Sequence, residues 1–135
     1  MILTFVTPEK KIVVNQPVDE VILPGFRGEL QLLPGHAPMV TTLTTGILKW
    51  KASGSLQLNQ AVVSWGYCEI SPGGISVLAD LADLPEEIDL RSGKDRMKAA
   101  DHKRQTETLS DEEWEKLDRE ILRIQAQSQV LGQPN

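Results

Sequence analysis

Few side chains in this sequence could act as catalysts or metal ligands, and they are scattered along the chain. There is one cysteine, Cys68, and there are two histidines, His36 and His102. A zinc site of the usual Cys/His type needs more of these ligands than that. Asp80 and Asp83 could share a proton in acid–base chemistry, but no histidine or nucleophile lies near them in the sequence. We therefore expect no catalytic residue and no metal site, and we interpret both carboxylates as solvated turn residues.

The composition narrows the classes of partner. A net charge of −5 and a pI near 5.0 argue against general nucleic-acid binding. A lone cysteine excludes an internal disulfide and favours a reducing compartment, and the position of Cys68 in an alternating apolar segment predicts a buried, unreactive thiol. No apolar run approaches the roughly 20 residues that a membrane span needs, and the first residues are too polar for a secretory signal. We expect no cofactor, and contact with a membrane only through another protein.

The first part of the chain, residues 1–84, predicts strands. Short segments rich in β-branched residues, among them ILTFV, KIVV, VDEVILP, SLQLN and AVVSWGYCEI, are separated by turn-forming pairs such as Pro24-Gly25 and Ser53-Gly54. Strands that recur at this spacing are typical of an antiparallel sandwich or barrel. We expect a β-sandwich of about ten short strands over this range.

The remaining residues, 85–135, carry more charge and predict an antiparallel hairpin of two helices. Asp89 is the expected N-cap of the first helix, which should run to about Glu107. The apolar face of this helix is poor, and Gly93 lowers its intrinsic stability. On its own it should be weakly stable.

The second predicted helix opens with a capping box in which Ser110 and Glu113 bond each other's backbone. Apolar residues then recur every three or four positions, and Gly132 and Pro134 are expected to end the helix. The stripe comprises Trp114, Leu117, Ile121, Ile124, Ser128 and Leu131. It needs a partner surface, either on the sandwich or on another protein.

The densest motif is GELQLLPGHAPMVTTLTTGIL, at residues 28–48, in which Pro34 and Pro38 stiffen a corner around His36. A second motif, AVVSWGYCEISPGGISVLAD, lies at residues 61–80. Together with the order of the two parts, these motifs resemble the epsilon-subunit family of the F-type ATP synthase, in its bacterial form. The resemblance covers essentially the whole chain.

The resemblance implies a non-catalytic rotor subunit in the central stalk, which couples proton flow through the membrane rotor ring to ATP synthesis. The sandwich would bind the gamma subunit and touch the ring, so the complex would lie at the cytoplasmic face of the bacterial cell membrane. Arg27, Glu29 and His36 are the implied contacts with the ring or gamma. A solvated carboxylate at Glu29, and a histidine at position 36 that only caps its own turn, remain the plainer interpretations.

The same resemblance implies that the hairpin inhibits ATP hydrolysis by approaching the catalytic alpha and beta subunits. The candidate contacts are cations of the first helix, namely Arg96, Lys98, Lys103 and Arg104. A solvated charged face is the general alternative for such a run.

Nucleotide-binding members of the family open the hairpin with Ile/Leu-Asp-x-x-Arg-Ala, whereas this chain has Ser92 and Gly93 at the last two positions. We therefore expect weak or absent ATP binding. The candidate nucleotide contacts are Asp89, Arg91, Arg119 and Arg123.

A second function class fits the same pattern. A freestanding β-sandwich that binds proteins could dimerise through the apolar stripe of its helical tail, because such stripes often pair between chains. A small hydrolase does not fit, since the sequence offers no catalytic constellation.

Overall fold

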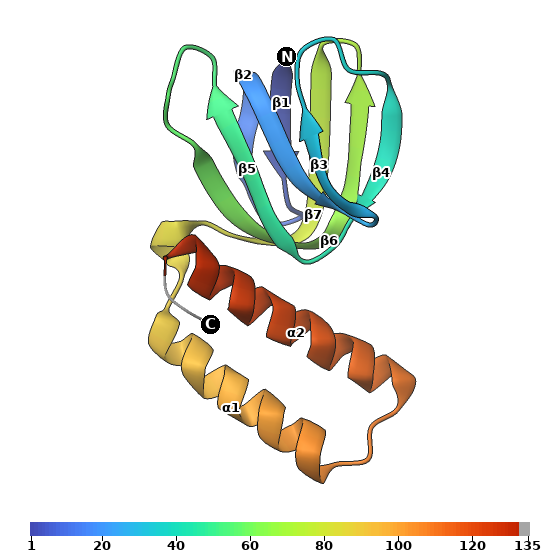
Figure 1. Ribbon diagram of the computed structural model, residues 1–135, viewed down its shortest axis with the longest axis vertical. Helices are drawn as coiled ribbons and strands as arrows, with labels where there is room; N and C mark the ends of the chain where they lie inside the picture. The colour runs from blue at the N-terminus through green and yellow to red at the C-terminus, as the bar shows by residue number, and fades with distance from the viewer. Residues whose placement is uncertain (133–135) are drawn as a thin grey trace.

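A computed structural model describes residues 1–132, and in it a β-sandwich is followed by two antiparallel helices (Figure 1). The strands are β1 (Ile2–Val6), β2 (Lys11–Gly25), β3 (Gly28–Leu32), β4 (Met39–Leu43), β5 (Gly46–Ala52), β6 (Asn59–Ser71) and β7 (Gly74–Asp83). A short 3₁₀ turn, η1 (Pro85–Glu87), leads to α1 (Leu90–Thr106) and α2 (Asp111–Val130). The predicted fold class is confirmed.

The described residues form seven strands rather than about ten. Two predicted strands, KIVV and VDEVILP, join into the long β2. Pro17 lies between them and has no backbone N–H to donate, but the strand continues through this position. The predicted strand SLQLN is a loop over residues 55–58, with Leu56 97% exposed, and only its last residue, Asn59, belongs to β6. The pattern of alternating apolar residues therefore predicted more strands than the sandwich contains.

The strands close on one another in the order β1-β7-β6-β4-β2-β3, and β5 bridges β2 and β6. β1 runs parallel to β7 and antiparallel to β2, and the other pairings are antiparallel. The inner faces enclose a single apolar cluster, in which Phe5 and Trp50 meet edge to face with ring centroids 5.9 Å apart. The sandwich thus has a core of its own.

A sharp corner in β6 lies at Trp65 and Gly66, which have φ values of 59° and 135°. Before the corner β6 pairs with β5, and after it β6 pairs with β4. A side chain at Gly66 would overlap the carbonyl oxygen of Leu78 and lie 2.8 Å from the Cα of Ala79. Glycine is therefore required at this position.

Both helices begin at their predicted caps. The Asp89 side chain accepts hydrogen bonds from two backbone N–H groups of α1, and Ser110 and Glu113 form the predicted capping box of α2. α1 ends at Thr106, one residue before the predicted limit. Gly132 takes a positive φ of 74° just past α2, whereas Pro134 lies outside the described residues.

α2 lies between the sandwich and α1 (Figure 1) and packs on β5 and β6. Leu117, Ile121 and Ile124 of the predicted stripe are buried, as expected. Two further residues, Ala126 and Gln127, are buried although the stripe omits them. α2 therefore uses two faces, one toward α1 and one toward the sheet.

The segment of β6 from Ala61 to Ser64 shows the effect of this docking on the sheet. All four residues are buried, although side chains in a strand alternate between faces. Ala61 and Val63 belong to the sandwich core, so alternation directs Val62 and Ser64 to the outer face, where α2 packs. The hairpin covers surface that the sandwich would otherwise expose.

Candidate functional site

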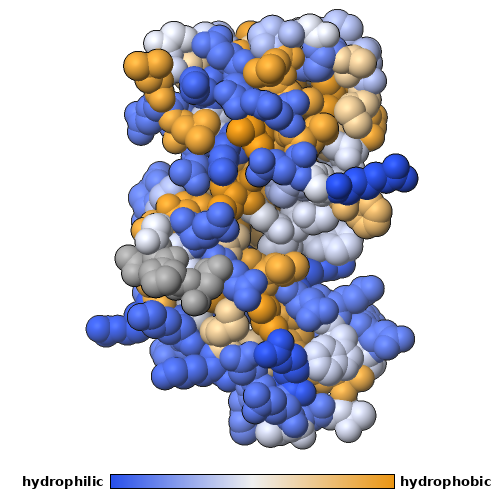
Figure 2. Space-filling model, viewed as in Figure 1, coloured by the Kyte–Doolittle hydropathy of each residue, from blue (hydrophilic) through white to orange (hydrophobic). Residues whose placement is uncertain are grey.

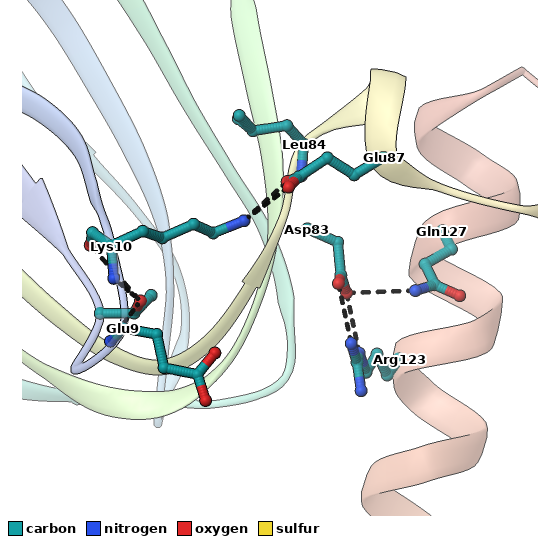
Figure 3. Close-up of polar contacts among 8 residues, drawn as sticks. Glu9, Lys10, Asp83, Leu84, Glu87, Arg123 and Gln127 are labelled. Carbon is teal, nitrogen blue, oxygen red and sulfur yellow. Dashed lines mark hydrogen bonds and ion pairs between the residues drawn. The ribbon is translucent and has the colours of Figure 1, made fainter.

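The junction between sandwich and hairpin is held by a partly buried ion pair (Figure 3). The Arg123 guanidinium donates two hydrogen bonds to the Asp83 carboxylate, from Nε at 2.8 Å and from Nη2 at 2.7 Å. Gln127 Nε2 donates a third, at 3.1 Å. The interpretation of Asp83 as a solvated turn residue is therefore wrong, since α2 folds back onto the end of β7. Asp80 is exposed, as that interpretation expected, but it lies within β7 and not in a turn.

The electrostatics of this pair favour the charged carboxylate. Burial by itself raises the pKa of Asp83, but the hydrogen bonds and charge of Arg123, together with Gln127, outweigh it and leave the pKa below its ordinary value. The bond to Asp83 likewise raises the pKa of Arg123. Both partners therefore stay ionised at neutral pH.

Gln127 extends this contact to α1. Its side chain is 4% exposed, and its Oε1 accepts a hydrogen bond of 3.0 Å from Arg96 Nη2. Arg96 also donates to Glu120 at 3.0 Å through Nη1. We call Asp83, Arg123, Gln127 and Arg96 the clasp, because they join β7, α2 and α1.

The linker between the two parts is fixed from the other side. Lys10 Nζ donates to both carboxylate oxygens of Glu87, at 2.7 and 2.8 Å, and the same carboxylate accepts from the Leu84 backbone N–H (Figure 3). The hydrogen bond from Lys10 is the main reason that the pKa of Glu87 is lowered. The start of the hairpin is thus tied to the turn between β1 and β2.

A second contact across the junction joins Trp65 and Arg119. The Arg119 guanidinium carbon lies 3.5 Å from the centroid of the Trp65 ring, a cation–π arrangement. Trp65 holds a left-handed backbone conformation that costs a bulky residue about 1–3 kcal/mol. The indole is therefore placed on the outer face, where α2 can meet it.

The structure does not bring the four nucleotide candidates together. Arg123 is paired with Asp83, and Arg119 is stacked on Trp65. Asp89 uses its carboxylate to cap α1, and Arg91 is exposed on that helix. Arg119 and Arg123 do line one hollow of about 200 Å³ together with Lys116, but Asp89 and Arg91 do not line it, so the four candidates form no common site in this arrangement.

The predicted interface residues separate into two places. Arg27 and Glu29 are exposed at the turn between β2 and β3, beside the helices, whereas His36 lies in the loop between β3 and β4 at the far end of the sandwich (Figure 1). Glu29 also lines a groove of about 350 Å³ whose other wall is α2, at Leu122 and Gln129.

His36 is partly buried, and neither of its ring nitrogens has a hydrogen-bond partner within residues 1–132. Its backbone N–H, rather than its side chain, closes the turn through a 3.3 Å bond to the Leu33 carbonyl oxygen. A cap formed by the imidazole is therefore absent from the described structure.

Sequence reasoning missed an exposed apolar surface around β4, although the residues themselves are apolar. Phe26 is 73% exposed and Val40 is 69% exposed, and Met39 and Tyr67 are also exposed. The backbone N–H of Phe26, in the turn between β2 and β3, donates to the carbonyl oxygen of Thr42 in β4, and Thr42 pairs with Tyr67 in β6. Figure 2 shows apolar side chains among hydrophilic ones on the sandwich, while the end of the hairpin away from the sandwich is mainly hydrophilic in this view.

The four candidate inhibitory cations do not share one face of α1. Arg96 is bound to α2, and Arg104 pairs with Asp101 at 2.8 Å. At 100° per residue, Lys103 lies on the side of Arg96 and Lys98 lies nearly opposite. Both lysines are exposed and form no ion pair within residues 1–132.

Cys68 is fully buried, as predicted, and burial raises the pKa of its thiol to about 12, which disfavours the reactive thiolate. In the described part of the chain, no three His, Cys, Asp or Glu side chains gather as metal ligands would. No described helix is long and apolar enough to span a membrane.

Comparison with solved structures shows that the whole arrangement recurs. A chain of the Euglena gracilis mitochondrial ATP synthase, solved with OSCP, F1 and c-ring, superposes with a TM-score of 0.84 at 23% identity, covering 97% of this chain and 81% of that one. A chain of the Tetrahymena thermophila mitochondrial ATP synthase central stalk and c-ring gives 0.66 at 11% identity, covering 97% and 96%. At these identities the comparison establishes the fold.

Sequence comparison establishes the relationship. The ATP synthase epsilon chain of Bdellovibrio bacteriovorus is 49% identical over 98% of this chain and 95% of its own length. The epsilon chain of Geobacter sulfurreducens is 35% identical over 94% of this chain and 90% of its own length. The profile of the ATP synthase delta/epsilon chain β-sandwich domain matches residues 1–85. Epsilon chains are not themselves catalytic, and the chain belongs to the ATP synthase epsilon family.

Proposed function

We propose that the chain is a rotor subunit of the central stalk, which couples proton flow through the membrane ring to ATP synthesis. The similarity to epsilon chains over nearly the full length, hairpin included, carries this proposal. A dimerising tail is less suited to the structure, because Leu117 and Ile121 of the stripe are already packed against α1. In the cell, the complex would place the chain peripherally at the cytoplasmic face of the bacterial membrane.

The sandwich is proposed as the binding domain. The exposed apolar residues Phe26, Met39, Val40 and Tyr67 offer the surface expected of a protein interface, and we assign them to gamma. Arg27 and Glu29, at the β2–β3 turn, are assigned to polar contact with the ring. The corner around His36 would contribute through its outer surface, since both ring nitrogens are covered.

The hairpin is proposed as a brake on ATP hydrolysis. It has little core of its own, so alternative positions are energetically accessible. Moving it along the stalk would bring Arg96, Lys98, Lys103 and Arg104 toward the catalytic subunits. Attraction to acidic groups there would oppose rotation and weaken with salt.

Truncation tests both assignments in the assembled enzyme. A chain ending at Asp89 should still bind gamma, and ATP hydrolysis should rise. Replacing the four cations with Ala should reproduce part of the rise, less so at high salt, whereas Lys11→Ala, an exposed charge on the sandwich, should not. Loss of gamma binding by a folded truncation would contradict the binding assignment. Unchanged hydrolysis would leave the hairpin as a passive support.

A further inference from the structure

We propose that the clasp is a relay, in which release of the hairpin from the sandwich also unfastens α1 from α2. The inference deepens the proposed brake, because it names how the cations of α1 are set free. Only the effect of the released hairpin on ATP hydrolysis rests on the proposed function. The coupling between the two contacts is a property of the isolated chain.

The relay runs through one buried amide. Gln127 Nε2 donates to Asp83 of β7, and Oε1 of the same side chain accepts from Arg96 of α1. The opposite orientation would face the amide oxygen to the carboxylate and the amide hydrogens to the guanidinium, so the two charges fix the amide. Asp83 therefore helps to keep the Oε1 atom of Gln127 pointing toward Arg96 by binding the Nε2 atom of the same amide.

The burial of Gln127 makes the two bonds interdependent. With only 4% of the residue exposed, an amide that loses Asp83 retains an unsatisfied donor unless it turns toward water. Turning removes the acceptor from Arg96 Nη2. Arg96 Nε has no partner within residues 1–132, so the guanidinium keeps only its bond to Glu120.

The apolar contacts between the helices lie toward the other end of the hairpin. The cluster of Ala100, Leu117 and Ile121 is extended by Met97, Leu109 and Trp114, close to the loop that joins the helices. Near the linker, Arg96 bonds to Gln127, and a Cβ placed on Gly93 would lie 3.8 Å from the Ile124 Cγ2 atom, so the helices approach closely there without a large apolar cluster. Breaking the clasp should therefore open the hairpin from its linker end.

Hydrogen exchange of the full-length chain, read by mass spectrometry, tests the relay. Asp83→Asn should speed exchange about tenfold in the second half of α2, because α2 loses a charged hydrogen-bond acceptor, and also in the first half of α1, because Gln127 then releases Arg96. Asp80→Asn removes the same charge from an exposed site on the same strand and should change neither. Faster exchange in α2 without α1 would overturn the relay, and no change in either would overturn the clasp.

Gln127→Met removes both amide hydrogen bonds of the relay but leaves the Asp83–Arg123 pair in place. It therefore still tests the relay if Asp83→Asn also destabilises the sandwich. It should speed exchange in the first half of α1 more than in α2. Adding Asp83→Asn should then release α2 with no further effect on α1. An additional effect on α1 of the same size as in the native background would show that the two contacts are independent.

These measurements are separate from the test of the brake. If the relay fails while truncation still raises ATP hydrolysis, the brake stands and opens by another route. If the relay holds while truncation leaves hydrolysis unchanged, the coupling serves the stability of the hairpin and the brake is wrong.

Discussion

The sandwich and the hairpin differ in where their stability comes from. The sandwich encloses seventeen buried residues in one apolar cluster, whereas the cluster between the helices has three. A fully buried large side chain contributes roughly 1.5–3 kcal/mol, and ordering each residue costs about 1–2 kcal/mol. A cluster as small as that of the hairpin cannot offset the ordering of two helices, so docking on β5 and β6 must supply the rest.

This difference suggests a division of roles. A domain with its own core can bind its neighbours permanently, while an appendage held by a few polar contacts can change position. The predictions below test this contrast by making comparable changes in the two parts of the molecule.

The largest effect is expected from Gly66→Ala at the corner of β6. The new methyl group would overlap the Leu78 carbonyl, and φ at this position is 135°. We expect a loss of about 4 kcal/mol or more in the free energy of unfolding of the sandwich. Urea denaturation measures it, with Gly54→Ala, also at positive φ but in open space, as the control for backbone strain alone. Equal losses in the two variants would contradict the steric argument.

A pair of leucine truncations should separate the two regions. Leu48 is fully buried in the sandwich core, and Leu48→Ala should cost about 2–5 kcal/mol across the whole domain. Leu117, 8% exposed, lies in the small hairpin cluster, and Leu117→Ala should loosen the helices alone. Hydrogen exchange in β2 and in α2 distinguishes these results. If Leu117→Ala also destabilised β2, the two parts would share one cooperative unit.

The contrast also explains what the sequence could predict. The caps at Asp89 and Ser110 depend on residues two or three positions away, so local patterns identified them. The pair Asp83–Arg123 joins residues 40 positions apart. No local pattern links them, and their contact exists only because α2 folds back onto the sheet.

The second buried face of α2 was missed for a related reason. Ala126 is small and Gln127 is polar, so neither contributes to an apolar stripe. Trp65 offers a partial signal, since a large aromatic residue before a glycine in a strand suggests a corner. That Arg119 stacks on Trp65 could be seen only in the structure, because the contact depends on how α2 docks on the sheet.

A smaller effect should appear as the pH falls. The folded pKa of Asp83 lies below the ordinary value of 3.8, so this carboxylate stabilises docking above that pH and loses its contribution as the pH falls through the folded value. Exchange in α2 should rise under acid before exchange in β2 does. In the Asp83→Asn variant, hydrogen exchange in α2 should already be fast at neutral pH and should increase less as the pH falls. An identical acid response in the two proteins would assign the effect to other carboxylates, such as Glu87.

The smallest effect should be a gain, from Gly93→Ala in α1. The same substitution that clashes at Gly66 meets only ordinary contacts here, with the Ile124 Cγ2 atom at 3.8 Å and the Arg96 Nη2 atom at 3.9 Å. Alanine favours the helix over glycine by about 0.5–1 kcal/mol, largely through the unfolded chain. Protection of the α1 amides should rise by a few fold, while that of β2 stays constant, because the hairpin gains stability without touching the sandwich. Ala99→Gly, at an exposed position of the same helix, should lower protection by a similar factor. If Gly93→Ala instead weakened α1, Ile124 and Arg96 would be held too rigidly to admit a methyl group, and the hairpin would be packed more like the sandwich than its small core indicates.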